Sequence, residues 1–253
     1  MNILVTNDDG IRAKGIKELV EALSDFGKIF VVAPDSQKSA CGHGITIHDP
    51  VMVQEVSFKG TEKAWAVSGT PADCVKLGST MLIPEKIDIL FSGINQGGNM
   101  GTDILYSGTV SGAIEGILLG IPSVAVSLDS NKGDDFEASK RISRTVCRHM
   151  MIKELERETL LNINIPYVHK DNIKGVKITK LGIREYTESF QERKDPRGRL
   201  YYWYSGIPKN VFSEGDTDVM AVEKGYISIT PIHFDLTNYR IINDIKDWGI
   251  RYE

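Results

Sequence analysis

Cysteine is scarce in this chain: 253 residues contain three, far apart at Cys41, Cys74 and Cys147. None of them lies in a CxxC pair or in a Cys/His spacing typical of zinc ligands. The sequence therefore predicts neither a disulfide framework nor a zinc site. Free thiols are typical of proteins in a reducing compartment, so we expect a cytoplasmic location.

The common nucleotide and hydrolase motifs are also missing. The sequence has no GxGxxG, no GKS or GKT and no GxSxG, so it gives no support for a dinucleotide fold, a P-loop or a nucleophile elbow. Asp216-Thr217-Asp218 is similar to the start of an aspartyl-phosphate site, but no apolar strand precedes it. We therefore predict that this segment caps a helix.

Excess positive charge and long apolar runs are absent as well. Lysine and arginine number 30 against 34 aspartates and glutamates, a net charge of −4, whereas nucleic-acid grooves are usually basic. The most apolar stretch, 113–128, carries Glu115 and Pro122, which argues against a membrane-spanning helix. The first residues are not a basic segment followed by an apolar one, so they do not resemble a signal peptide. We expect no nucleic-acid partner and no membrane span. The negative net charge is still compatible with a small phosphate-bearing ligand, because a bound cation can supply positive charge locally.

The composition is that of an ordinary globular protein, 41% hydrophobic and 25% charged, and strand patterns alternate with helix patterns. This order predicts an α/β fold: a Rossmann-like, doubly wound, mainly parallel sheet in a single domain, 1–253. Apolar runs predict strands at 2–6, 29–33, 87–92, 123–126 and 226–231. Helical spacing and cap residues predict helices around 16–23, from Thr70, at 110–119 and at 135–156.

Two segments do not follow this pattern, which leaves a core of about 1–182 and 211–232. Residues 183–210 are charged and then aromatic, with turn residues at 196–198, and we predict a projecting β-hairpin. Its four consecutive aromatics predict a subunit contact, the alternative being burial against the chain's own core. In 233–253, apolar residues at helical spacing predict an amphipathic tail helix that docks on a neighbour.

The first predicted strand runs into Asn7-Asp8-Asp9-Gly10. In an open α/β sheet, ligands bind outside the carboxyl ends of the strands, where this tetrapeptide lies. Two adjacent carboxylates repel each other unless one takes up a proton or both face a cation. Such oxygen ligands suit Mg²⁺, Mn²⁺ or Ca²⁺. We interpret the pair as a metal site in preference to a solvated turn, which the same residue types also favour.

Two further loops are expected at the same edge of the sheet. Residues 35–44 form a small polar loop that contains His43, a side chain suited to acid or base chemistry. Residues 92–110 combine a strand end, several glycines and the start of a helix. Because the first backbone N–H groups of a helix are free to bind an anion, this second loop predicts a phosphate site.

Four side chains of the 92–110 loop carry suitable groups. The carbonyl oxygen of Asn95 suits a hard cation, and the amide of Asn99 can hold a phosphoryl oxygen. Ser107 and Thr109 offer hydroxyl donors to an anion, although their alternative role is to cap the helix, and both roles are compatible.

Several blocks of the sequence, taken in order, resemble the SurE family of stationary-phase survival proteins and nucleotidases, over nearly the whole chain. The blocks are Ile3–Gly10, Val32–Asp35 with Ser39, Ser68–Val75, Ser92–Asn95 with Gly97, Asn99 and Gly101, Tyr106–Val110, Asp216–Asp218 and Ser228–Pro231.

The resemblance implies one divalent metal ion per subunit, Mg²⁺ or Mn²⁺, bound by Asp8, Asp9, Ser39 and Asn95. It implies that phosphate is bound by Asn99 and by the turn Ser107-Gly108-Thr109. It also implies a cytoplasmic phosphatase that acts on nucleoside monophosphates. The assembly it implies is a homodimer or homotetramer in which a carboxyl-terminal segment is exchanged between subunits.

Our hypothesis is a metal-dependent phosphomonoesterase that hydrolyses nucleoside 5′-monophosphates to nucleoside and phosphate, with Asp8 and Asp9 as catalytic residues. One of the two carboxylates orients the attacking water or accepts its proton, and direct attack by a carboxylate stays open. A non-catalytic nucleotide sensor is one alternative. A Mg²⁺-dependent phospho-acceptor module is another, although such a module needs an aspartate in the neighbourhood of Asn95.

Overall fold

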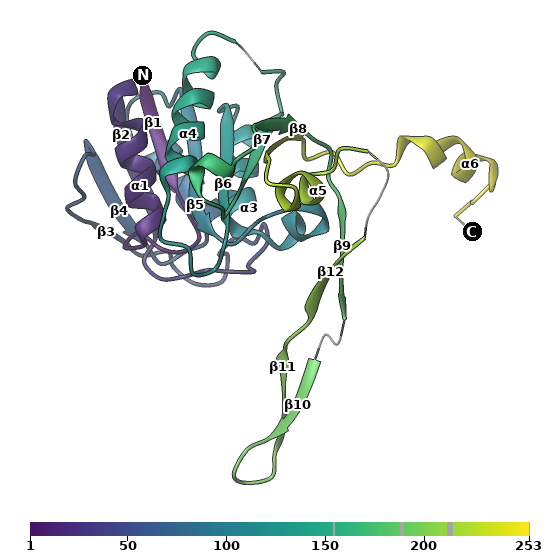
Figure 1. The fold of residues 1–253 in the computed structure, drawn as a ribbon. Coiled ribbons are helices and arrows are strands. Elements are labelled where there is room, and N and C mark those ends of the chain that lie inside the picture. Colours follow the sequence, from purple (N-terminus) through teal and green to yellow (C-terminus); the bar gives the residue numbers. More distant parts are fainter. Residues whose placement is uncertain (154, 188–189, 212–214, 253) are drawn as a thin grey trace.

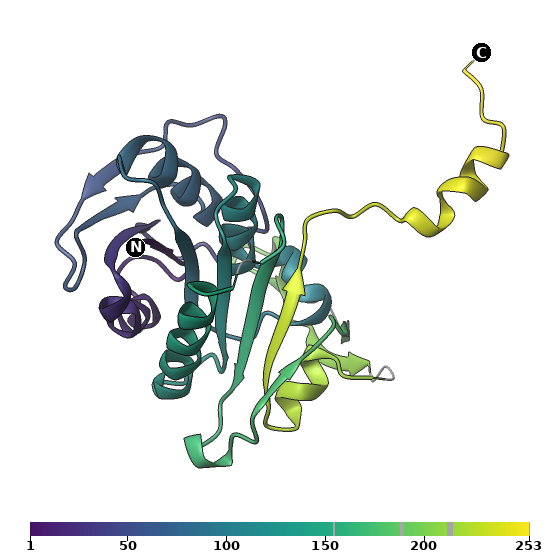
Figure 2. The same cartoon turned by 90° about the horizontal axis from the view of Figure 1, so that it is seen from above.

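The computed structural model describes residues 1–153, 155–187, 190–211 and 215–252. Four parts of the predicted segments therefore lie outside the described residues: 154 in the 135–156 helix, 188–189 in the hairpin, 212–214 in the core and 253 in the tail. Figure 1 shows a layered core from which a long ribbon and a C-terminal tail leave in different directions. The view from above in Figure 2 shows the tail extending away from the layers.

A nine-stranded sheet forms the centre of the described core, in the order β3-β4-β2-β1-β5-β6-β7-β13-β8. Neighbouring strands are parallel except for two pairs, β3 with β4 and β13 with β7. The predicted α/β class with a mainly parallel sheet is therefore confirmed. The strands are β1 (Asn2–Thr6), β2 (Lys28–Pro34), β3 (Val53–Glu55), β4 (Lys63–Val67), β5 (Ile89–Gln96), β6 (Ser123–Asp129), β7 (Leu160–Pro166), β8 (Val176–Ile178) and β13 (Ile227–Ile232).

Helices cover both faces of this sheet, as a doubly wound fold requires. α1 and α4 contact each other on the face toward which Ile3 and Val5 of β1 point. α2 and α3 contact each other on the opposite face, toward which Leu4 points. Because side chains alternate along a strand, β1 is buried on both sides, which explains its continuous apolar run. The helices are α1 (Lys14–Leu23), α2 (Pro71–Leu77), α3 (Gly108–Leu118), α4 (Glu137–Met150), α5 (Asp218–Glu223) and α6 (Ile242–Asp247).

The chain reverses its direction of winding between β1 and β5. From β1 the strands proceed through β2 to β4 on one side, and from β5 they proceed through β6 to β7 on the other. Asp8 lies two residues beyond the end of β1, and Asn95 lies near the end of β5. The topology thus brings both residues to the crevice at the carboxyl ends of the strands, where ligands bind in folds of this class.

Two predicted boundaries are wrong. The strand predicted at 87–92 begins at Ile89 and runs on to Gln96, because pairing with β6 resumes at Asn95 after an irregularity beyond Ser92. The helix predicted to end near 156 ends at Met150. The next two side chains, Met151 and Ile152, are exposed, so no core surface remains for a further turn to cover.

Two predicted helix caps are confirmed. The Thr70 hydroxyl accepts a hydrogen bond from the backbone of Asp73 at 3.2 Å, and the Asp73 carboxylate accepts one from the Thr70 N–H at 2.9 Å. This reciprocal pair fixes the start of α2. At α5 the Thr217 hydroxyl alone acts as the cap, accepting from the N–H of Met220.

A projecting ribbon, here called the arm, consists of β9 (Ile183–Thr187), β10 (Phe190–Lys194), β11 (Leu200–Tyr204) and β12 (Ile207–Val211) (Figure 1). β9 pairs with β12 near the core, and β10 pairs with β11 beyond them, both antiparallel. The predicted hairpin is therefore present. Its aromatic side chains at 201–204 are exposed, so the alternative of burial against the chain's own core is wrong. The subunit contact at these side chains stays a prediction.

The predicted tail helix is present as α6, and it also leaves apolar side chains exposed, among them Trp248 at 70%. Its docking on a neighbouring subunit stays a prediction, as does the division into core, arm and tail. Among the described residues, none of the helices combines the length and the apolar character that crossing a membrane requires.

Candidate functional site

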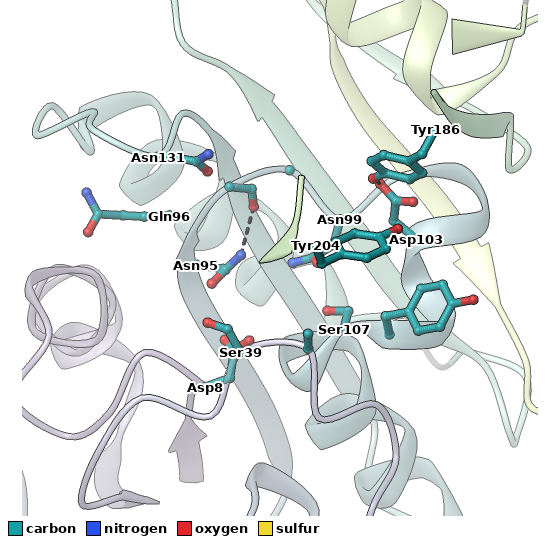
Figure 3. A pocket seen from close by; sticks show the side chains of 14 residues that line it. Asp8, Ser39, Asn95, Gln96, Asn99, Asp103, Ser107, Asn131, Tyr186 and Tyr204 are labelled. Atoms are coloured by element: carbon teal, nitrogen blue, oxygen red, sulfur yellow. Dashed lines mark hydrogen bonds between the residues drawn. The ribbon is translucent and has the colours of Figure 1, made fainter. Parts of the chain in front are cut away.

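A cavity of about 540 Å³ opens at the crevice between β1 and β5, within the size range of small-molecule sites. Five residues singled out by the sequence line it, and they come from three separate loops or strand ends (Figure 3). These residues are Asp8, Ser39, Asn95, Asn99 and Ser107.

Asp8 is the most buried acid of the cavity, with 4% of its surface exposed. Burial raises the pKa of its carboxyl to about 6, and the neighbouring Asp9 contributes to the rise. The Thr109 hydroxyl donates a hydrogen bond of 2.7 Å to Asp8 Oδ1 and orients the carboxylate. A Cβ atom at position 108 would lie 2.7 Å from the Asp8 Cβ, so only glycine allows α3 to approach this closely.

Asp9 lies beside the cavity and is absent from its lining. One carboxylate oxygen accepts a hydrogen bond from the backbone N–H of Gln96 at 3.2 Å, and the other accepts a long one, 3.4 Å, from Gln37 Nε2. Partial burial raises the pKa of Asp9 as well. Its carboxylate therefore lies between the loop that carries Ser39 and the strand that carries Asn95.

Ser39 and Asn95 complete the polar end of the cavity. Gln37 Nε2 donates to the Ser39 hydroxyl at 2.9 Å. Asn95 Nδ2 donates to the Gly97 carbonyl at 2.8 Å, which leaves the Asn95 side-chain oxygen facing Asp8 and Ser39 in Figure 3. The donor set thus consists of carboxylate, hydroxyl and amide oxygens. It fits a hard divalent cation, which would also offset the mutual repulsion of the two acids.

No cluster of three or more His, Cys, Asp or Glu side chains suited to a metal occurs in the described residues. A cation held here would therefore need neutral oxygen donors in addition to the two carboxylates. His43, considered as an acid or base, does not line the cavity. Its Nε2 lies 3.0 Å from the buried carboxylate of Glu115 instead.

The predicted phosphate-binding residues divide into two groups. Asn99 and Ser107 line the cavity next to the N-terminus of α3, and the Ser107 hydroxyl also accepts a hydrogen bond of 3.1 Å from the Val110 N–H as the helix cap. Gly108 and Thr109 lie behind them, in contact with Asp8. The sequence could not separate the pair that lines the cavity from the pair that lies behind it.

A buried amide network that sequence reasoning missed holds Asn99 in place. Asn164 of β7 donates to the Asn99 carbonyl at 2.9 Å and accepts from the Asn99 N–H at 2.8 Å. Asn162 donates to the same carbonyl, and Asn99 Nδ2 donates to the Ser127 hydroxyl at 2.8 Å. Asn162, Asn164 and Ser127 are fully buried. The available signal was polar residues at alternate positions of an otherwise apolar strand.

The other end of the cavity is aromatic and was also missed. Tyr186 and Tyr204 of the arm line it together with Asp103. The Tyr186 hydroxyl donates to Asp103 Oδ2 at 2.6 Å, and the Arg184 guanidinium lies 3.1 Å from the same oxygen. These arm residues are distant in sequence from the three polar loops, so no local motif connects them to the site.

Comparison with known proteins identifies relatives along the full length of the chain. The family model described as "Survival protein SurE" matches residues 3–188. A protein of Syntrophomonas wolfei named 5′-nucleotidase SurE is 49% identical over 97% of this chain and 94% of its own. A protein of the same name from a Thermoanaerobacter species is 47% identical, and the match covers both chains completely. The crystal structure of the Aquifex aeolicus SurE protein superposes with a TM-score of 0.85 at 40% identity, covering 99% of this chain and 100% of that one.

Proposed function

The chain belongs to the SurE family, and we propose that it is a 5′-nucleotidase, which hydrolyses nucleoside 5′-monophosphates to nucleoside and phosphate. Relatives that are 49% to 50% identical over nearly the full length carry that name. The observation that carries the proposal is the meeting of Asp8, Ser39 and Asn95 with Asn99 and Ser107 in one cavity. An oxygen donor set for a cation thereby adjoins an amide, a hydroxyl and a helix N-terminus suited to phosphate.

The proposal includes one divalent metal ion per subunit, Mg²⁺ or Mn²⁺, held by Asp8, Asp9, Ser39 and Asn95. When bound, such an ion polarises a phosphoryl oxygen and makes water more acidic. The support for this assignment is the oxygen-only donor set and the raised pKa of Asp8, since a buried acid pair is stabilised by a neighbouring cation.

The chain's own groups then have distinct tasks. Asp8, a buried carboxylate at the polar end of the cavity, is suited to accept a proton from the attacking water. Asn99 Nδ2 and the Ser107 hydroxyl, which lie beside the N-terminus of α3, are suited to donate hydrogen bonds to the phosphoryl oxygens. Attack by a carboxylate on phosphorus is the competing route, and it would form an acyl phosphate that water then hydrolyses.

We also propose that the protein works in the cytoplasm as a homodimer or homotetramer, with a nucleoside monophosphate as its small-molecule partner. The exposed aromatics at 201–203 of the arm and the apolar side chains of α6 support self-association, because surfaces of this kind are usually covered. Light scattering on the purified protein measures the assembly directly.

Phosphate release from AMP and from a chromogenic phosphomonoester, with and without a chelator, tests the proposed activity. We expect release that stops when the metal is removed and returns when Mg²⁺ or Mn²⁺ is added. If no such substrate releases phosphate in a metal-dependent manner, the nucleotidase assignment is wrong, and the non-catalytic nucleotide sensor takes its place.

A further inference from the structure

The aromatic end of the cavity has no role in the chemistry described above. Figure 3 shows Tyr186, Tyr204 and Asp103 on the side of the cavity away from Asp8 and Ser39, with Asn99 and Ser107 between the two groups. A ligand whose phosphate lies near Asn99 and Ser107 would therefore extend its other end toward the two tyrosines.

The two tyrosines differ in how firmly they are held. Tyr186 is fixed through its hydroxyl, which donates to Asp103 at 2.6 Å, while Arg184 pairs with the same carboxylate. Tyr204 is 64% exposed, and its ring packs against two aromatic neighbours: its ring centroid is 6.4 Å from that of Tyr186 and 5.5 Å from that of Phe190. A large aromatic face is thus presented at the rim of a polar cavity without a covering group from the described chain.

We propose that Tyr204, positioned by Tyr186, forms the nucleobase subsite of this enzyme and stacks against the base of the substrate. The inference rests on the proposed nucleotidase function and adds the group that recognises the nucleoside. Every nucleobase has a flat π-face, and stacking on an aromatic ring is tolerant of base identity. The arm therefore selects nucleotides over phosphate esters that have no base, and it does so with a side chain outside the α/β core.

Three variants test the subsite. Tyr204→Ala removes the stacking ring, Tyr204→Phe retains it, and Trp203→Ala is the matched control. Trp203 is the preceding residue of β11, and because side chains alternate along a strand it points to the opposite face. It is absent from the cavity lining. The mass of each variant is checked by light scattering, so that kinetic constants are compared between equal assemblies.

We expect Tyr204→Ala to raise the KM for AMP roughly five- to fiftyfold while kcat stays close to that of the unchanged protein, because stacking contributes to binding rather than to phosphoryl transfer. Inhibition by adenosine should weaken by a similar factor. Inhibition by inorganic phosphate, which reaches only the polar end, should stay unchanged. Tyr204→Phe and Trp203→Ala should behave as the unchanged protein in all three measurements.

Two results would overturn the subsite. One is an unchanged KM for AMP and unchanged adenosine inhibition in Tyr204→Ala. The other is an equal loss of inhibition by phosphate, which would mean that the substitution disturbs the polar end. Calorimetric titration with adenosine separates this inference from the proposed activity. If Tyr204→Ala weakens adenosine binding, the subsite is supported even if no AMP is hydrolysed. If both proteins bind adenosine equally, or if the unchanged protein does not bind it, the subsite is refuted.

Discussion

The two ends of the cavity are built in opposite ways. At the polar end, Asn99 is 9% exposed and is hydrogen-bonded on its backbone and its side chain by residues that solvent does not reach. At the aromatic end, Tyr204 belongs to a ribbon that projects from the core and is largely exposed. The contrast separates two demands: phosphoryl transfer needs fixed donors, whereas recognition of a flat base tolerates an adaptable surface.

The difference has a physical origin in the cost of burying polar groups. Each amide in the network behind Asn99 would be destabilising without its partners, so the hydrogen bonds allow essentially one arrangement of the loop. In the outer part of the arm, by contrast, all side chains of β10 and β11 are exposed. Substitutions at the two ends should therefore have effects of different kinds.

The largest effect is expected for Asp8→Asn. Asparagine retains an oxygen that can accept from Thr109, so the fold should persist, but it removes a charge from the proposed metal site and the group suited to accept a proton. We expect kcat/KM for AMP to fall by roughly a hundredfold or more. Circular dichroism and a steady-state phosphate assay measure the two properties, and turnover equal to that of the unchanged protein would remove Asp8 from the site.

Asn164→Ala should lower both the free energy of unfolding and kcat/KM, the latter by less than Asp8→Asn does. The substitution deprives the Asn99 N–H of its partner and should reduce the free energy of unfolding by about 2 kcal/mol. Because the loop that carries Asn99 is then less fixed, kcat/KM should fall roughly tenfold. Ser228→Ala is the matched control: Ser228 pairs opposite Asn164, is fully buried, and its hydroxyl has no hydrogen-bond partner in the structure. Equal losses in both variants would contradict the network's role.

The metal-free protein should lose stability as the pH rises. The folded-state pKa of Asp8, about 6, lies above its unfolded value, so between the two values the folded protein retains a proton that the unfolded chain has lost. Stability is therefore greater near pH 4.5 than near pH 7.5, by roughly 2 kcal/mol from this group. Denaturation in chelator at several pH values measures the slope. Asp8→Asn should flatten it, and a slope unaffected by that substitution would contradict the assignment.

The smallest effect on folding is expected in the exposed segments. Trp248 of α6 is 70% exposed, so Trp248→Ser should change the free energy of unfolding by no more than about 0.5 kcal/mol. If α6 docks on a neighbouring subunit, the same substitution should lower the mass measured by light scattering at limiting concentration. An unchanged mass would mean that Trp248 does not contribute to assembly.

The sequence predicted the parts of the site that a local pattern encodes. Asp8 and Asn95 each follow or end an apolar strand, and the parallel order of those strands is sufficient to bring them together. The capping pair of Thr70 and Asp73 is likewise encoded within four residues. In each case the signal and the structure that it predicts lie within one element or its neighbour.

The sequence did not predict contacts that depend on how distant elements meet. Asn164 and Asn99 are 65 positions apart, and a buried asparagine in a strand does not identify its partner. Tyr204 reaches the cavity because the arm leaves the core in one particular direction, which no residue pattern in 183–210 specifies. The exclusion of Asp9 from the cavity lining is of the same kind, since the direction of each side chain in an acid pair depends on the loops around it.

Anomalous diffraction from crystals grown with Mn²⁺ would locate the cation that the proposed activity requires. We expect one strong peak per subunit among the side-chain oxygens of Asp8, Asp9, Ser39 and Asn95. A peak elsewhere in the molecule, or these four side chains turned away from a common point while the crystals contain Mn²⁺, would contradict the account.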